Sequence, residues 1–499
     1  MRWTLWLLPL GLLAQRPPAA DAARRYREAN ETKIIREYVE LLKIPNVSAD
    51  RANIRRNAAQ IAKIYAARGV RTELVELEGA NPAVYGELLV PGATRTYLIY
   101  AHYDGQPVDP ANWKDSGPFE PVLRTAPVEA NGKLLPIDQP KYDREWRLFA
   151  RSATDDKIPI MALAAALDAM NAAGIKPKAN LKFFFEGEEE AGSPNLSKLL
   201  AKVKDRLRGD VWLICDGPVH QSRAQSIGFG ARGVAGLELT VYGAKRGLHS
   251  GHYGNWAPNP AMNLARLLAS MNDGEGRVLV KGFYDDVVPL TALELDAIAT
   301  NPPQDDSLKK ELGIAESQPF GGELRRSIYQ PTLNVRGLES AGVGQKAANV
   351  VPPEARASID LRLVKGNDGR RQADKVIAHI REQGYFVVEG REPTGEERAK
   401  HPRLARVDVS LSYNAFRTPL DLPIAQEIVK VAKSVREPVI LIPSSGGSLP
   451  LVVFEEVTGV PVVGVPIANH DDNQHTHNEN MRIGNLWDGI ELLAALLAM

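Results

Sequence analysis

The chain has 499 residues, of which 61 are Lys or Arg and 61 are Asp or Glu, so its formal net charge is zero. Hydrophobic residues make up 44% and charged residues 24%, which is typical of soluble globular domains and excludes a globally basic nucleic-acid binder or a highly acidic disordered chain. The single cysteine, Cys215, excludes an internal disulfide framework and thiolate-rich metal sites, so any metal must be bound by carboxylates and the nine histidines.

The N-terminus has the pattern of a secretory signal peptide. A positive start at Met1-Arg2 is followed by an apolar run at 3–14, and Ala20-Asp21-Ala22 fits a cleavage site. The run is too short to cross a bilayer, which needs about 20 apolar residues, and no later stretch is long and apolar enough. We expect residues 1–22 to be removed on export to the periplasm or the medium; without such processing the protein would be cytoplasmic.

Helices and strands alternate in the region 30–229. Apolar residues at helical spacing predict helices at 33–44, 54–67 and 157–173. Short apolar runs bounded by polar residues predict strands at 71–77, 85–90, 96–100, 181–185 and 211–215. This order predicts an open, mostly parallel α/β sheet that is covered by helices on both faces.

The pattern changes at 230–413, where the predicted order is β-α-β-β-α-β, a ferredoxin-like α+β arrangement. The predicted strands are 236–243, 331–336, 355–364 and 406–412, and the predicted helices are 260–271 and 371–381. A polar excursion at 273–330 interrupts them. The α/β pattern returns at 414–499, with a helix at 423–434, a strand at 438–442 and a helix at 485–499. We therefore expect an α/β domain, split into two parts, with a second domain inserted in it.

Clusters of His and carboxylate residues follow several predicted strands. His102 and Asp104 lie just beyond a strand, where functional groups of open α/β sheets gather, and a carboxylate beside an imidazole can orient it as a metal ligand. Asp155 and Asp156 precede the helix at 157–173. Each pattern has a simpler interpretation, as a surface His–Asp pair or as a helix cap.

A third cluster holds four glutamates within five positions. Glu186, Glu188, Glu189 and Glu190 would repel one another unless a cation or a proton offsets their charge, or unless they form a solvated loop. Asp216 follows another apolar strand, and the C-terminal region concentrates the last three histidines: His470, His475 and His477. Together these clusters match a two-metal hydrolase, whose ions lie about 3.5–4 Å apart.

The chain resembles the carnosinase and cytosolic nonspecific dipeptidase group of the aminoacylase–carboxypeptidase-G zinc metallopeptidase superfamily. The resemblance extends over residues 30–499. It rests on these motifs, in this order: AHYDGQPVD (101–109), ARSATDDK (150–157), FEGEEEAGS (185–193), ICDG (214–217), GLHSGHYG (247–254), RVLVKGFYDDV (277–287), NVVPPEA (349–355), SSGGSLP (444–450) and HTHNE (475–479).

The resemblance implies a catalytic domain with two divalent ions, zinc or else manganese, and an inserted lid that forms a homodimer. His102 and Asp216 would bind one ion, Glu190 and His475 the other, and Asp155 both.

The resemblance also implies roles beyond the metal ligands. Glu189 would be the general base, Asp104 would support His102, and His249 of the lid would stabilise the oxyanion, often across a dimer. Arg362 would bind the carboxylate of the substrate. Asn349 and Ser448 fall near positions that contact the substrate.

Several positions depart from the family pattern. The usual Gly-Arg-Gly before the shared aspartate is Ala150-Arg151-Ser152, and Ile158 replaces a glycine. Glu188 competes with Glu189 as the base. His477, and after it His470, competes with His475 as a ligand.

These features predict an exported dinuclear zinc hydrolase that cleaves an amide bond next to a free carboxylate, acting as a dipeptidase or small-peptide carboxypeptidase. The alternatives are an N-acyl amino-acid deacylase, a catalytically silent binding protein and a zinc storage protein. The expected partners are a small peptide substrate and a second copy of the chain. Neither nucleic-acid binding nor stable membrane insertion is expected.

Overall fold

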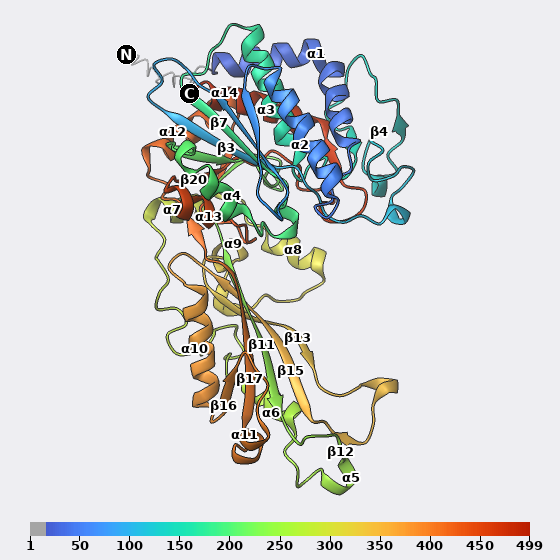
Figure 1. The fold of residues 1–499 in the computed structure, drawn as a ribbon, viewed down its shortest axis with the longest axis vertical. Helices are drawn as coiled ribbons and strands as arrows, with labels where there is room; N and C mark the ends of the chain where they lie inside the picture. The colour runs from blue at the N-terminus through green and yellow to red at the C-terminus, as the bar shows by residue number, and fades with distance from the viewer. Residues whose placement is uncertain (1–15) are drawn as a thin grey trace, which may run out of the picture. The chain divides into compact units, whose positions relative to one another are not determined.

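A computed structural model describes residues 16–499 (Figure 1). The described residues form two compact units: unit 1 comprises 16–227 with 421–440 and 457–499, and unit 2 comprises 228–420 with 441–456. The predicted mixed α/β character is confirmed. The apolar run at 3–14 lies outside the described residues, and within 16–499 no helix has both the length and the hydrophobicity needed to cross a membrane.

An eight-stranded sheet, most of it in unit 1, carries the central strands β7, β3, β8 and β20, which run parallel to one another. Strand β2 is antiparallel to β7, and β1 is antiparallel to β2. In sheet order the strands are β1 (Arg71–Val75), β2 (Ala83–Leu88), β7 (Asn180–Glu186), β3 (Thr96–His102), β8 (Val211–Ile214), β20 (Val462–Gly464), β9 (Gln225–Gly228) and β19 (Val439–Ile442).

Helices α1, α3 and α14 of unit 1 pack against one another (Figure 1). Nearly every residue of α3 is buried, which accounts for its Ala, Leu and Met content. The helices of unit 1 are α1 (Pro18–Leu42), α2 (Arg51–Ala66), α3 (Lys157–Ala172), α4 (Leu196–Lys202), α12 (Pro423–Val435) and α14 (Ile483–Leu497).

Helix α1 begins at Pro18, and its backbone is non-helical at Asn30, so the helix predicted from Lys33 matches the second segment of α1. The first segment was not predicted, because the buried residues of its first turns are alanines. Their small side chains give no amphipathic signal, although alanine is the best helix former.

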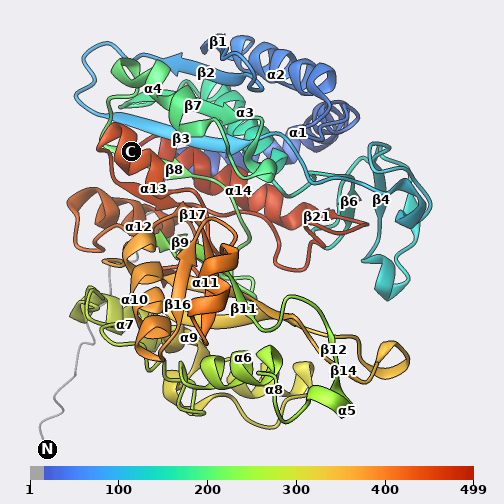
Figure 2. The same cartoon turned by 60° about the horizontal axis from the view of Figure 1, so that its bottom comes forward.

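A small four-stranded sheet in unit 1 was not predicted (Figure 2). Its strands β6 and β21 are antiparallel, and Phe149 pairs with Asn480. Strands of two or three residues are too short to show a period of two in the sequence. This pairing brings the segment after β6 next to the segment before β21. In sheet order the strands are β21 (Asn480–Arg482), β6 (Arg147–Phe149), β4 (Val122–Arg124) and β5 (Leu134–Leu135).

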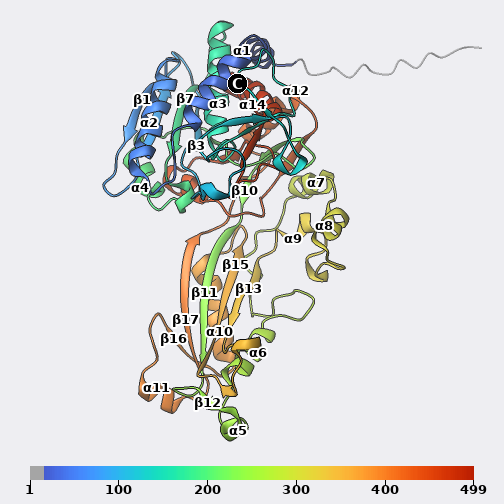
Figure 3. The same ribbon diagram turned by 90° about the vertical axis from the view of Figure 1, so that its right-hand side faces the viewer.

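Unit 2 contains a five-stranded sheet with helices α6 (Pro260–Ala269) and α10 (Gly369–Glu382) packed on it (Figure 3). Along β11, residues such as Leu237 and Leu239 are buried in the core with both helices, whereas Glu238 between them is exposed. Strand β16 runs parallel to β17 and was not predicted. In sheet order the strands are β13 (Thr332–Glu339), β15 (Glu354–Leu363), β11 (Gly233–Tyr242), β17 (Leu404–Tyr413) and β16 (Phe386–Glu389).

Further helices and strands complete the chain. The helices are α5 (Ser250–Tyr253), α6 (Pro260–Ala269), α7 (Ala292–Thr300), α8 (Asp305–Leu312), α9 (Leu324–Ser327), α10 (Gly369–Glu382), α11 (Gly395–Lys400) and α13 (Val452–Thr458). The strands are β10 (Gly230–Ala231), β12 (Leu248–His249), β14 (Val350–Val351) and β18 (Phe416–Arg417). The predicted polar excursion at 273–330 therefore contains three helices, α7, α8 and α9.

Candidate metal centre and active site

The parallel strands of unit 1 deliver acidic and imidazole side chains to one edge of the sheet. His102 is the last residue of β3 and pairs with Glu186, the last residue of β7. Asp216 follows β8, while Asp155 and Asp156 immediately precede α3. Because the carboxyl ends of parallel strands meet at one edge, residues far apart in the chain converge there.

Two groups of three potential ligands lie at this edge. In the first group, ligand atoms of His102, Asp156 and Asp216 all lie within 4.8 Å of one another. In the second, the same holds for Asp155, Glu190 and His475. These groups contain the five predicted ligands together with Asp156, which had been given no ligand role.

Asp155 contacts a histidine of each group. Its Oδ1 lies 3.0 Å from His102 Nε2 and its Oδ2 lies 3.0 Å from His475 Nε2. The second histidine also lies 3.3 Å from Glu190 Oε2. The two carboxylate oxygens of Asp155 therefore face the two groups, as expected of a residue shared between two ions. The peptide bond between Asp155 and Asp156 is cis.

Asp104 organises the glutamate loop beside His102. Its carboxylate accepts the backbone N–H groups of Glu189 and Glu190, both at 3.1 Å. Its Oδ1 also lies 3.4 Å from His102 Nδ1, and the backbone carbonyl oxygen of Asp104 lies 3.3 Å from the same nitrogen. One buried residue, Asp104, thus fixes both the imidazole and the loop that bears the two glutamates.

The structure separates the two candidates for the base. Glu189 Oε2 lies 4.0 Å from His102 Nε2, within the cluster. Glu188 instead accepts the backbone N–H of Asn81 at 2.7 Å and the side-chain amide of Asn195 at 2.8 Å. Glu188 therefore holds neighbouring loops, and Glu189 faces the candidate ligands.

Burial and mutual repulsion shift the titration of this cluster. Burial, followed by the nearby charges of Asp216 and other acids, raises the pKa of Glu189 to about 9. Burial raises the pKa of Glu190 to about 7 and that of Asp216 to about 6. Burial opposes the charge of His102, but its contacts with aspartates raise its pKa well above the usual value. Bound protons thus offset the negative charge, a role that cations can also fill.

The side chains present fit divalent cations. The Oδ1 atom of Asp156 is buried and has no hydrogen-bond partner among the described residues, as expected of an oxygen whose partner is an ion. Imidazole and carboxylate donors together suit zinc and manganese.

Four further predicted site residues belong to unit 2. Arg362 donates from Nη1 to Ser448 Oγ at 2.8 Å and from Nε to Asp360 Oδ2 at 2.9 Å. His249 and Asn349 lie near each other through the pairing of β12 with β14, and the carbonyl of Asn349 accepts the backbone N–H of the residue after His249. The structure thus brings them together as two pairs within unit 2.

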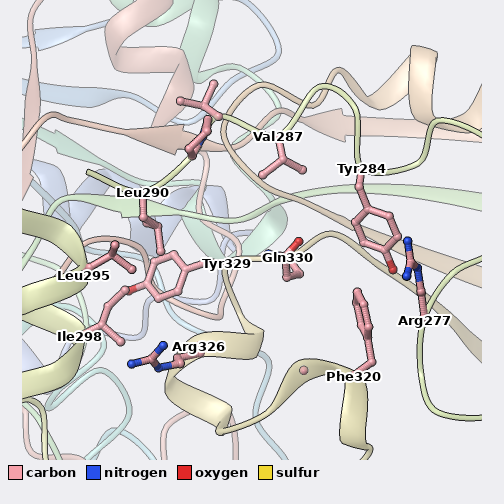
Figure 4. A pocket seen from close by; sticks show the side chains of 13 residues that line it. Arg277, Tyr284, Val287, Leu290, Leu295, Ile298, Phe320, Arg326, Tyr329 and Gln330 are labelled. Atoms are coloured by element: carbon pink, nitrogen blue, oxygen red, sulfur yellow. The ribbon is translucent and has the colours of Figure 1, made fainter. Parts of the chain in front are cut away.

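Unit 2 contains a hydrophobic cavity of about 680 Å³ that lies apart from the predicted site residues (Figure 4). Its lining comes from the segment 277–330, and Figure 4 shows Arg277 beside Tyr284 and Phe320. None of the predicted site residues lines this cavity. The convergence of side chains, rather than the size of a cavity, therefore locates the candidate active site.

The family model of peptidase family M20/M25/M40 matches residues 98–499. The chain belongs to this family.

Two curated relatives and one solved structure of the M20 family are similar to the chain over most of its length. The Cys-Gly metallodipeptidase DUG1 of Candida albicans is 26% identical, covering 94% of this chain and 95% of the relative. The Beta-Ala-His dipeptidase of Homo sapiens is 27% identical, covering 83% of this chain and 76% of the relative. An M20 metallo-carboxypeptidase of Sulfolobus solfataricus has a TM-score of 0.72 at 27% identity, covering 92% of this chain and 97% of that structure. The predicted family resemblance is confirmed.

In this M20 peptidase, a residue that was not predicted from the sequence ties together the loops that carry Asp155 and His475. Glu479, which is 0% exposed, accepts five hydrogen bonds from the loop before α3. The donors are Arg151 Nη1, the backbone N–H groups of Ser152, Thr154 and Asp155, and the Thr154 hydroxyl, at 2.8–3.0 Å. The position of Glu479, four residues after His475 in the HTHNE motif, was the available signal.

Both loops contain residues in the left-handed backbone region. His475 has a φ of 60°, and so does Ser152, which stands where the family pattern has glycine. A side chain there costs roughly 1 kcal/mol or more, so other contacts must hold each loop. Asn46 donates to the Ser152 hydroxyl at 2.8 Å. His475 contacts Asp155 and Glu190, whereas the alternative ligand His477 contacts the hydroxyl of Thr476.

Replacing Glu479 with Gln should weaken metal binding. An amide cannot accept hydrogen bonds at its NH₂ group, so donors of the Asp155 loop lose their partner and the loop loosens. Loss of such a supporting contact typically lowers metal affinity about 10–100-fold. Chelator competition with the metal-loaded protein measures this change.

The matched control is Glu129→Gln, an exposed position that accepts a hydrogen bond from Asn473 of the same C-terminal loop. We expect this variant to bind metal as the unmodified protein does. Unchanged metal affinity in Glu479→Gln would show that the five hydrogen bonds do not position the ligands.

Proposed function

We propose that this M20 peptidase hydrolyses the amide bond of dipeptides or small peptides with a free C-terminal carboxylate, using two divalent ions, zinc or else manganese. The observation that carries the proposal is the contact of Asp155 with both histidines at 3.0 Å, with Glu189 beside them. The dipeptidase names of the curated relatives support the substrate class. The intact cluster favours an enzyme over a silent binding protein.

The proposed ligands of one ion are His102 and Asp216, and those of the other are Glu190 and His475. Asp155 is proposed to bind both. When bound, two such cations would polarise a carbonyl group and lower the pKa of a water molecule. Asp104, close to His102 Nδ1, keeps that imidazole oriented with Nε2 toward the cluster.

Glu189 is proposed to move the proton. Its carboxylate projects into the cluster from a loop that Asp104 fixes by hydrogen bonds to two backbone N–H groups. As a carboxylate it can accept a proton from the attacking water and pass it to the leaving amine. The positive charge of two ions would favour this carboxylate form over the protonated form that burial favours in their absence.

Glu189→Gln should lower kcat by about 100–10,000-fold, the usual contribution of a general base, without loss of bound metal. Glu188→Gln is the matched control, because Glu188 is the adjacent acid but contacts Asn81 and Asn195 instead. Steady-state hydrolysis of a dipeptide and metal analysis of both variants test this. Full turnover by Glu189→Gln, or an equal loss in Glu188→Gln, would refute the assignment.

Arg362 and Ser448 are proposed to hold the substrate carboxylate. The guanidinium of Arg232 lies in the same region of unit 2, where burial and the charge of Arg362 lower its pKa to about 10. Arg362 and Arg232 both interact with a single carboxylate, that of Asp360. The carboxylate of a bound substrate would offset the remaining positive charge. His249 is proposed to stabilise the oxyanion, with Asn349 among the substrate contacts.

Arg362→Ala should raise KM for a dipeptide by at least about tenfold, because a charge-assisted hydrogen bond contributes about 1.5–3 kcal/mol. For a C-terminally amidated dipeptide, the same variant should have the same KM as the unmodified enzyme. Arg336→Ala, an exposed arginine paired with Glu238 on the same sheet, is the control. An equal effect of Arg362→Ala on both substrates would refute a carboxylate clamp. Faster turnover of N-acetyl amino acids than of dipeptides would favour the deacylase alternative.

We also propose that the protein is a homodimer formed through unit 2. Edge strand β13 and the loop after it expose large hydrophobic side chains, with Leu338 64% and Val343 84% exposed. Exposed edges of this kind favour pairing with another chain. Sedimentation velocity should show a dimer for the unmodified chain and a monomer for Leu338→Asp. A monomeric unmodified chain would contradict this proposal.

Export is proposed as well, because the apolar run at 3–14 and the positive charge before it match a signal peptide.

A further inference from the structure

The segment around the expected cleavage site is built into unit 1. Arg16 donates from Nη1 to the carbonyl of Val435 at 3.0 Å, and its Nε lies 2.9 Å from Asp21 Oδ1. Its guanidinium also pairs with Glu491 on α14. Helix α1 begins two residues later, at Pro18. This part of the chain therefore has fixed partners in α12 and α14.

The first turns of α1 are buried through alanines. Ala20 and Ala23 are both 0% exposed, and Ala19 and Ala22 are also buried. Ala20 packs in a small cluster with Val435 of α12 and Ala495 of α14. Small side chains at these positions let α1 lie close to both helices.

A buried acid of α14 fixes the same end of α1. Glu491 is 5% exposed and contacts three arginines: Arg16, Arg24 and Arg27. Removing the first of them would leave a buried carboxylate with fewer of its partners, which is costly in a low-dielectric interior.

Cleavage after Ala22 would damage this packing. It would remove Arg16 and three buried alanines, and it would create a charged α-amino group on Ala23, which is fully buried. Burying an unpaired charge is strongly unfavourable. The Ala20-Asp21-Ala22 pattern thus has a structural explanation as the buried start of a helix.

We infer that processing on export cuts the chain before Arg16, so that residues 16–22 remain in the mature protein as the first turns of α1. This inference rests on the proposed export. It places the mature N-terminus upstream of the cleavage site that the sequence pattern indicated.

Two measurements test the inference. The full chain is expressed in a Gram-negative host, and the intact mass of the protein in the periplasm or medium gives its N-terminus. We expect an N-terminus at or before Arg16, whereas one at Ala23 would overturn the inference. If the chain stayed in the cytoplasm with its leader intact, the export proposal would fail, and with it any cut before Arg16.

The second measurement tests the structural basis whether or not the chain is exported. Chains starting at Arg16 and at Ala23 are released from a cleavable tag and melted. We expect the shorter chain to melt at least about 5 °C lower, which is a change of a few kcal/mol in a domain of this size. Within the longer chain, Arg16→Ala should lower the melting temperature and Arg25→Ala, at an exposed position of α1, should not. Equal melting of the two chains would overturn the inference.

Discussion

The buried carboxylate of Glu479 is the contact on which the candidate active site depends most. Strands β3 and β8 fix His102 and Asp216 through the main sheet, but Asp155 and His475 lie on loops. Those loops are far apart in the sequence and meet through the pairing of β6 with β21. Glu479 completes this junction by accepting hydrogen bonds from the Asp155 loop, so two strained loops form one surface.

Electrostatics explains why such support is needed. The site collects several carboxylates where burial raises the pKa values of Glu189, Glu190 and Asp216. Without cations, mutual repulsion tends to separate these groups, and only protons or tight hydrogen bonding keep them together. The neutral net charge of the whole chain hides this local concentration of acid.

The sequence predicted the parts of the site that follow long, buried elements. His102, Asp216 and Asp155 stand at the ends of β3 and β8 and at the start of α3, whose apolar patterns are clear. Several features gave no periodic signal and were not predicted. The strands β6, β21 and β16 are too short, and the side chains at the start of α1 are mostly small alanines. Glu479 was missed because its role lies in tertiary hydrogen bonds, which a local pattern does not reveal.

One cluster of imidazoles and carboxylates is proposed to bind two divalent ions. Calorimetric titration of the metal-free protein with zinc at pH 7, in buffers of different ionisation enthalpy, tests it most directly. We expect two ions per chain and net proton release: Glu190, whose pKa is raised to about 7, must lose its proton to bind an ion, and the ions would favour the carboxylate form of Glu189, whose pKa is raised to about 9. Binding of one ion or none, or binding without proton release, would contradict it.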